Sequence, residues 1–290
     1  MTTAERRAAF RRMVETRRGT LVAGAFNAMS ARVIEDIGFE AVYLTGAGVT
    51  NMALGLPDFS YVGLNEIADH TARMRDVVSL PLVVDADTGF GNAMNVRHTV
   101  KVLERSGADA IQMEDQDFPK KCGHFDGKAV ISAAEMASKI KAAVDARSDP
   151  NFLIIGRTDA RGVEGFDAAI ERAHRYAEAG ADILFVEAMT TMEEIAAVAK
   201  AFKKPLLINI VVGGKTPAMP VQAFGDMGYS LVLYANTALQ GAVLGMQNAL
   251  GSLKKNGLIE EKSGLVVGFE ERQRLVGKPA LDELSKGYAS

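Results

Sequence analysis

The sequence lacks tryptophan altogether and has a single cysteine, Cys122, in 290 residues. A lone cysteine excludes an intramolecular disulfide and is typical of a reducing compartment, so we expect a cytoplasmic protein. The chain also lacks any apolar run near the roughly 18 residues that a membrane span needs. Residues 1–18 are rich in arginine without the apolar core of a signal peptide, and their helical spacing predicts a leading amphipathic helix.

An excess of charge of either sign is absent too, since the net charge is only −3. This balance gives no basic surface for nucleic acid or for an anionic membrane, and we expect neither as a partner. Linkers rich in Gly and Ser or in Pro are also missing. We therefore predict one domain over residues 1–290, with residues 250–290 as a C-terminal helical extension.

Short apolar runs of strand length recur along the chain, separated by helical patterns such as 167–179 and 192–201. The runs are almost continuously apolar, which is typical of parallel strands covered on both faces. Eight β–α units predict an α/β fold of the (β/α)8 TIM-barrel class, with a doubly wound open sheet as the alternative. The predicted strands are Leu21–Ala25, Ala41–Leu44, Leu82–Val84, Ala110–Met113, Phe152–Ile155, Ile183–Val186, Leu206–Ile208 and Leu231–Leu233.

Polar or charged residues, or a tight glycine turn, follow six of these runs. Because the carboxyl ends of parallel barrel strands open on one mouth, we expect these residues to converge on a single site. They are the turn Thr45-Gly46-Ala47-Gly48, Asp85 with Asp87, Glu114 with Asp115, Arg157, Glu187 and Asn209.

Asp85 and Asp87 place two carboxylates two residues apart at the end of a strand, so both point to the same face. Two like charges at that spacing repel unless a cation or a proton lies between them. Together with Glu114 or Asp115 they form the oxygen-rich set that suits Mg²⁺. The alternative is a solvated pair that caps the following helix.

Arg157, Glu187 and Asn209 supply donors and an acceptor for an anionic substrate, with the arginine matched to a carboxylate fork. Backbone amides at the Thr45–Ala47 turn, a metal and the arginine would together hold a 2-oxo or 2-hydroxy carboxylate. Chelated in this way, the group stabilises an enolate and allows an adjacent C–C bond to break. The alternative for Arg157 and Glu187 is a structural ion pair between neighbouring strands.

Cys122 lies in the charged run from Glu114 to His124, directly after Lys120 and Lys121. Neighbouring cations favour the thiolate and lower the pKa of a thiol, so Cys122 could transfer a proton or act as a nucleophile. A small buried hydrophobic side chain is the alternative.

Six motifs stand in a fixed order: Tyr43-Leu44-Thr45-Gly46, Gly55-Leu56-Pro57-Asp58, Asp85-Ala86-Asp87-Thr88-Gly89-Phe90-Gly91, Glu114-Asp115-Gln116, Lys120-Lys121-Cys122-Gly123-His124 and Arg157-Thr158-Asp159-Ala160. From about Gly19 to Leu250 the chain resembles the isocitrate lyase and phosphoenolpyruvate mutase superfamily, and the Lys-Lys-Cys-Gly-His run is very specific to its lyase branches. The resemblance implies a (β/α)8 barrel that exchanges its eighth helix between subunits, usually in a homotetramer.

The resemblance also implies a set of site residues. Mg²⁺, with Mn²⁺ as a possible substitute, would be held mostly through water near Asp58, Asp85, Asp87 and Glu114. A mobile loop, Lys120–His124, would close over the substrate, with Cys122 as proton donor tuned by Lys121 and His124. The substrate would contact Thr45, Gly46, Ala47, Gly123, Arg157, Glu187 and Asn209.

The branch of the superfamily decides the substrate. Methylisocitrate lyases carry charged residues where this chain has Val211-Val212 and Gln240, so a third carboxylate would lack a partner. The expected reaction is therefore Mg²⁺-dependent cleavage of a malate-type 2-hydroxy dicarboxylate, such as 2,3-dimethylmalate or a methylisocitrate-like acid, to a 2-oxo acid and a short carboxylate. Oxaloacetate hydrolysis or decarboxylation, a carboxyphosphonoenolpyruvate phosphonomutase, and a barrel without catalysis that serves assembly or binding are the alternatives.

Overall fold

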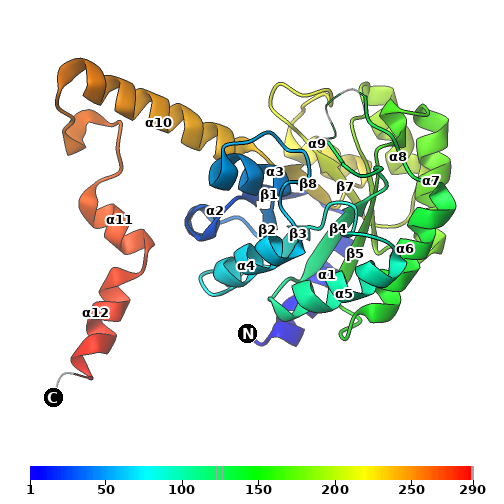
Figure 1. Ribbon diagram of the computed structural model, residues 1–290, viewed down its shortest axis with the longest axis horizontal. Coiled ribbons are helices and arrows are strands. Elements are labelled where there is room, and N and C mark those ends of the chain that lie inside the picture. The colour runs from blue at the N-terminus through cyan, green and yellow to red at the C-terminus, as the bar shows by residue number, and fades with distance from the viewer. Residues whose placement is uncertain (122, 124, 126, 289–290) are drawn as a thin grey trace.

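The protein forms a closed barrel of eight parallel strands in chain order, with β1 paired to both β2 and β8 (Figure 1). The computed structural model describes residues 1–121, 123, 125 and 127–288. Closure of the sheet confirms the predicted (β/α)8 class and excludes the open sheet. The strands are β1 (Thr20–Ala25), β2 (Val42–Leu44), β3 (Leu82–Asp85), β4 (Ala110–Glu114), β5 (Leu153–Thr158), β6 (Ile183–Val186), β7 (Leu206–Asn209) and β8 (Leu231–Tyr234).

Helices between the strands cover the outside of the barrel (Figure 1). Side-chain caps start several of them: Ser132 accepts the N–H of Glu135, and Thr191 accepts that of Glu194. The α-helices are α1 (Thr3–Glu15), α2 (Ala28–Ile37), α3 (Gly46–Val49), α4 (Leu64–Arg75), α5 (Ala93–Arg105), α6 (Ala133–Ala146), α7 (Phe166–Glu178), α8 (Met192–Ala201), α9 (Val221–Met227), α10 (Thr237–Asn256), α11 (Phe269–Leu275) and α12 (Lys278–Lys286). Short non-α turns are η1 (Thr50–Leu54), η2 (Ala160–Gly162) and η3 (Glu261–Ser263).

Two apolar layers form the core, one inside the barrel and one between the strands and the helices. Strand residues alternate between the layers, as in β5, where Leu153 and Ile155 face the interior and Ile154 faces the helices. The predicted leading helix is α1, and its Phe10 and Val14 join the interior layer. The described residues therefore pack the barrel interior, and a ligand would enter at its mouth.

Four strands run further toward that mouth than the apolar pattern indicates. β3, β4, β5 and β7 include Asp85, Glu114, Arg157 and Asn209, which were predicted to follow the strands. Sheet pairing continues through these polar residues, and Glu114 stands directly opposite Arg157 in the register of β4 and β5. The site residues are therefore held by sheet hydrogen bonds as well as by loops.

The C-terminal helices depart from the barrel pattern. α10 runs without a break through position 250 and projects from the barrel, and α11 and α12 continue beyond it (Figure 1). α11 contacts α2, where Arg274 forms an ion pair with Asp36 at 2.7 Å. Within the described part of the chain, no helix has the length and apolar character that a bilayer crossing requires.

Candidate active site

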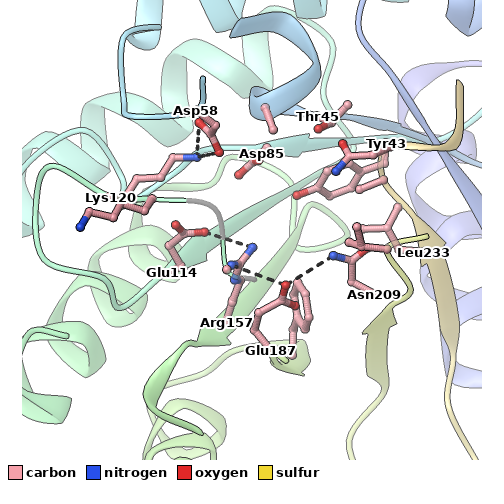
Figure 2. A pocket seen from close by; sticks show the side chains of 17 residues that line it. Tyr43, Thr45, Asp58, Asp85, Glu114, Lys120, Arg157, Glu187, Asn209 and Leu233 are labelled. Atoms are coloured by element: carbon pink, nitrogen blue, oxygen red, sulfur yellow. Dashed lines mark hydrogen bonds and ion pairs between the residues drawn. The ribbon is translucent and has the colours of Figure 1, made fainter. Parts of the chain in front are cut away.

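The mouth of the barrel contains one pocket that gathers side chains from most of the strands (Figure 2). The two-residue alternation of each strand turns Asp85, Glu114, Arg157, Glu187 and Asn209 to the inside, because each lies an even number of residues after an interior apolar residue. The pocket is lined by Tyr43, Thr45, Ala47, Asp58, Asp85, Glu114, Lys120, Lys121, Gly123, Arg157, Phe185, Glu187, Asn209, Val211, Leu233, Ala235 and Asn236.

A cluster of buried carboxylates forms one side of the site. Asp58, Asp85, Asp87 and Glu114 are each at most 8% exposed. The Lys120 ammonium lies against two of them, at 2.8 Å from Asp58 and 2.9 Å from Asp87. Asp85 instead accepts the backbone N–H of Gly46 at 3.2 Å. The alternative that Asp85 and Asp87 are solvated helix caps is excluded, because both are buried and α5 is capped by Asn92.

Burial dominates the electrostatics of this cluster. It raises the pKa of Asp87 to about 7, although Lys120 acts in the opposite direction. Burial also raises the pKa of Glu114, against the opposing effect of Arg157. Both shifts arise first from burial of the carboxylates, which disfavours their charged forms, and a divalent cation beside them would offset that cost.

The donor set fits Mg²⁺, since it consists of carboxylate oxygens. Among the described residues no three His, Cys, Asp or Glu side chains already form a metal-binding group. The Lys120 ammonium occupies the space between Asp58 and Asp87, and Mg²⁺ commonly keeps several waters between itself and the protein. The residues therefore suit an ion held largely through water, next to Asp85 and Glu114.

Arg157 forms the opposite side of the pocket. Its guanidinium contacts Asp159 at 2.9 Å, Glu114 at 3.3 Å and Glu187 at 3.8 Å, and it lies 5.1 Å from the centre of the Phe185 ring. Figure 2 shows it between Glu114 and Glu187. Burial would lower the pKa of Arg157, but the three carboxylates raise it, so its charge is permanent. The strand-to-strand ion pair considered from sequence does exist, and it lies inside the pocket.

Amide side chains complete this end of the pocket. Asn209 donates to Glu187 at 3.5 Å, and the Oδ1 atoms of Asn209 and Asn236 are buried without a hydrogen-bond partner among the described residues. A buried acceptor without a donor is costly, so both oxygens suit a ligand that donates a hydrogen bond. A substrate hydroxyl is such a group.

A network of amides positions Glu114. Gln112 donates to one carboxylate oxygen at 3.2 Å and Gln116 to the other at 3.1 Å. Tyr43 donates to Gln112 at 2.5 Å, and Gln116 also binds the backbone of Lys121 in both directions, at 2.8 and 2.9 Å. Glu114 is therefore linked to the segment that carries the predicted loop.

Asp115 lies behind the barrel wall and not in the pocket. Its carboxylate accepts hydrogen bonds from Thr158 at 2.7 Å, from the Asp159 N–H at 2.8 Å and from Tyr176 at 2.6 Å. The strand alternation explains this, because the residue after an interior Glu114 must face the helices. Of the two residues proposed as metal ligands on this strand, only Glu114 reaches the site.

Most of the predicted site residues meet in the pocket, with some exceptions. Gly46 and Asp87 do not line it: the Gly46 amide is bonded to Asp85, and Asp87 faces an adjacent cavity. Lys121 lines it, but its ammonium donates to the carbonyl of Gly127 at 3.0 Å. Cys122 and His124 lie outside the described residues.

Several lining residues were missed from sequence. Lys120 stood in the charged run but was not given a role, and its contacts with Asp58 and Asp87 depend on the folded loop. Tyr43 could have been found, because it lies two residues before Thr45 on the interior face of β2. Leu233 and Ala235 are apolar residues that a search for polar strand ends passes over, whereas Val211 was noted from sequence for its lack of charge.

Strained backbone borders the site. Asp87, Phe90 and Ala188 have φ values of 46°, 58° and 56°, in the left-handed region that non-glycine residues seldom adopt. They follow β3 and β6, the strands that carry Asp85 and lead to Glu187. Strain of this kind is concentrated at functional sites, which agrees with an active site at this mouth.

A barrel with buried carboxylates, an arginine and unpaired amide oxygens at the carboxyl ends of its strands defines a class, that of TIM-barrel enzymes acting on small anions. Residues 10–254 match the model of the phosphoenolpyruvate phosphomutase family. The chain belongs to this family, within the phosphoenolpyruvate mutase and isocitrate lyase superfamily.

Named relatives narrow the class. The 2-methylisocitrate lyase of Aeropyrum pernix is 47% identical over 85% of this chain and 79% of its own length. The 2,3-dimethylmalate lyase of Eubacterium barkeri is 38% identical over 98% of both chains. A crystal structure of a 2,3-dimethylmalate lyase superposes with a TM-score of 0.92 at 30% identity, covering 100% of this chain and 97% of that one. An oxaloacetate acetylhydrolase bound to 3,3-difluorooxalacetate also reaches 0.92 at 30% identity, with coverage of 99% and 97%.

These comparisons confirm two expectations from the sequence. The predicted superfamily is correct, and the expected carbon–carbon lyase type is that of the named relatives. They weigh against the alternative of a barrel that has lost catalysis.

Proposed function

We propose that this protein is a Mg²⁺-dependent lyase that cleaves a malate-type 2-hydroxy dicarboxylate into a 2-oxo acid and a short carboxylate. The observation that carries the proposal is the pocket that Asp85 and Glu114 line together with Arg157 and Asn209, with Glu114 in contact with the arginine at 3.3 Å. Such a pocket can hold a chelating 2-hydroxy carboxylate at one end and a second carboxylate at the other.

Asp58, Asp85, Asp87 and Glu114 would hold the metal, with Mn²⁺ as a possible substitute. When bound, the ion supplies Lewis-acid stabilisation of the negative charge that develops on the substrate oxygens. The protein's own part on this side is to hold Glu114 in place through Gln112 and Gln116 and to exclude bulk water with the described residues of the loop.

The remaining site residues orient the substrate. Arg157 receives the distal carboxylate, with Glu187 and Asn209 fixing the arginine and accepting the hydroxyl. The backbone would lie close to the substrate at Thr45, Gly46, Ala47 and Gly123, and Thr45 would also contribute its hydroxyl. The substrate's 2-hydroxyl loses its proton to a base, its oxygen pair forms the new carbonyl, and the C2–C3 bond breaks. The released pair stays on C3, which takes a proton from the Cys122 thiol, with Lys121 and His124 tuning that thiol.

The substrate's size class rests on the wall near β7 and β8. Val211, Leu233 and Ala235 make this wall apolar, and Gln240 is exposed with its amide donating to the carbonyl of Val212. A dicarboxylate with methyl substituents suits such a wall better than a tricarboxylate. Cleavage of 2-methylisocitrate is the second candidate, because relatives with that name reach 47% identity.

A substrate panel tests the proposal. Release of the 2-oxo acid is measured with Mg²⁺ and with EDTA: pyruvate from 2,3-dimethylmalate and 2-methylisocitrate, and glyoxylate from unsubstituted malate. Turnover of oxaloacetate and phosphonopyruvate is measured alongside. We expect the highest kcat/KM for 2,3-dimethylmalate and none in EDTA. Turnover of oxaloacetate alone would replace the lyase by a hydrolase, and equal turnover by Cys122→Ser would remove the thiol from the reaction.

We also propose that the protein is a cytoplasmic homotetramer whose subunits exchange α10. An apolar groove of about 680 Å³ lies between α2 and α9, on residues such as Val33, Ile37 and Val221. α10 carries exposed apolar side chains, Leu244 at 58% and Leu250 at 61% exposure. The apolar groove and the exposed apolar side chains of α10 would cover each other if α10 of one copy packed on the groove of another, which supports exchange of this helix between subunits.

Light scattering after gel filtration tests the assembly. Wild type and the control Gln247→Glu, on an exposed position of α10, are expected at the tetramer mass. Leu244→Glu would place a charge in the groove and is expected to yield smaller species. A monomeric wild type would contradict the proposed exchange.

A further inference from the structure

Lys128 is a buried cation that the proposed chemistry does not use. Its side chain is 4% exposed, its ammonium is 2.8 Å from Asp159, and it donates to the backbone carbonyl of Gly123. We propose that Lys128 is a positioning residue that fixes Gly123 against the substrate-binding Arg157 through Asp159. The inference deepens the proposed function, on which the role of Arg157 rests.

The anchor of Lys128 is the barrel itself. Just after it, the chain pairs in antiparallel fashion with the segment that follows β4: Asp117 N–H donates to the Ala129 carbonyl and Ile131 N–H to the Asp115 carbonyl, both at 2.9 Å. Lys128 therefore starts from a backbone tied to the end of β4 and reaches across to Gly123 on the other side of the loop. It is a fixed arm and not an exposed, freely rotating lysine.

Asp159 connects this arm with the pocket. One of its oxygens lies between Lys128 and Arg157, at 2.8 Å and 3.1 Å, and the other accepts from Arg157 at 2.9 Å. Its backbone N–H is held by Asp115 at 2.8 Å. A carboxylate shared by two cations neutralises only one of them, so Lys128 leaves Arg157 with more net positive charge for a substrate carboxylate.

Gly123 is where the arm acts on the site. A Cβ added to Gly123 would lie 2.3 Å from the Nη2 of Arg157 and 2.6 Å from the Cγ of Glu187, so its backbone rests directly on both. Holding the carbonyl of Gly123 thus sets how closely this part of the loop covers Arg157. The Lys128 ammonium therefore influences both the net charge around Arg157, through Asp159, and the position of Gly123 above Arg157.

Three variants test the proposal. Lys128→Met removes the charge and keeps most of the stem, Lys128→Arg keeps the charge, and Lys141→Met is the matched control. Lys141 lies on α6 with a side chain 71% exposed and forms an ion pair along the helix with Asp145 at 3.2 Å. For each variant we would measure the Tm and, by calorimetry, the affinity for oxalate in the presence of Mg²⁺. We would also measure kcat and KM on the malate that the wild type turns over with the highest kcat/KM, and the rate of tryptic cleavage after Lys120 and Lys121.

We expect Lys128→Met to weaken oxalate binding and raise KM by about tenfold, with a smaller change in kcat, because a charge-assisted contact is lost. Cleavage after Lys120 and Lys121 should accelerate by a similar factor, Lys128→Arg should recover most of both, and Lys141→Met should match wild type. Unchanged cleavage and unchanged oxalate affinity in Lys128→Met, even with a lowered Tm, would show a purely structural ion pair and overturn the proposal. If no malate is turned over by wild type, the proposed function fails, and the cleavage rates still decide the role of Lys128.

Discussion

Replacing Asp115 by alanine separates the structural carboxylates of this barrel from those of its pocket. Asp115 and Glu114 are adjacent in sequence, but only Glu114 reaches the pocket. Asp115 is fully buried and accepts hydrogen bonds from Thr158, from the N–H of Asp159 and from Tyr176, and it lies 3.3 Å from Arg172. We expect Asp115→Ala to destabilise the fold without removing the metal ligands.

The magnitude follows from the groups that lose their partner. The Asp159 N–H and the Tyr176 hydroxyl are left without an acceptor in a buried place, at about 1–3 kcal/mol each. Arg172 keeps Glu164 at 2.7 Å and the Ile131 carbonyl at 2.8 Å, so it adds little. Loss of the buried Asp115 carboxylate, whose pKa burial raises, returns part of this cost. The net loss should be about 3–5 kcal/mol, as for other buried charge networks broken from one side.

Urea unfolding with and without Mg²⁺ measures the loss, and calorimetry measures Mg²⁺ affinity in the folded variant. Asp85→Ala is the contrasting variant, and it should weaken Mg²⁺ binding by at least about a hundredfold. Its loss of metal-free stability should be smaller than that of Asp115→Ala, because removing one of several crowded carboxylates offsets the loss of the acceptor for the Gly46 N–H. We expect Asp115→Ala to bind Mg²⁺ like wild type and to lose kcat/KM, because Asp159 and hence Arg157 shift. The reasoning is refuted if Asp115→Ala loses Mg²⁺ binding as completely as Asp85→Ala, or if it unfolds at the wild-type urea concentration.

Two further predictions concern a close approach in the site and the base of the barrel. Gly123→Ala should lower kcat/KM by about tenfold or more, because the added Cβ would lie 2.3 Å from the Nη2 of Arg157. The Tm should shift by less than about 2 °C. Unchanged kinetics would show that Gly123 does not contact the arginine during turnover. Phe10→Ala should lower the free energy of unfolding, measured in urea, by about 3–5 kcal/mol, because Phe10 is fully buried in the interior layer. Its KM should stay at the wild-type value, because the residue lies far from the mouth. A changed KM would contradict this separation.

Much of the fold could be predicted from the sequence, because a parallel strand covered on both faces is apolar along most of its length. All eight predicted strands exist, with ends that shift by a few residues. At their carboxyl ends β3, β4, β5 and β7 extend to include Asp85, Glu114, Arg157 and Asn209, where sheet pairing continues through polar residues that a hydrophobic pattern cannot include. The hydrophobic pattern predicts that these residues follow the strands, whereas the backbone hydrogen bonds of the sheet include them in the strands.

The sequence by itself determined the barrel class, the family and the convergence of polar residues at one mouth, because these follow from local pattern and from the fixed direction of parallel strands. Only the tertiary structure decided which of the carboxylates Glu114 and Asp115 faces the pocket, that Lys120 bridges Asp58 and Asp87, and that Lys128 meets Asp159. These contacts join segments up to 62 residues apart. They depend on strand phase and loop path, which a linear pattern of residues does not contain.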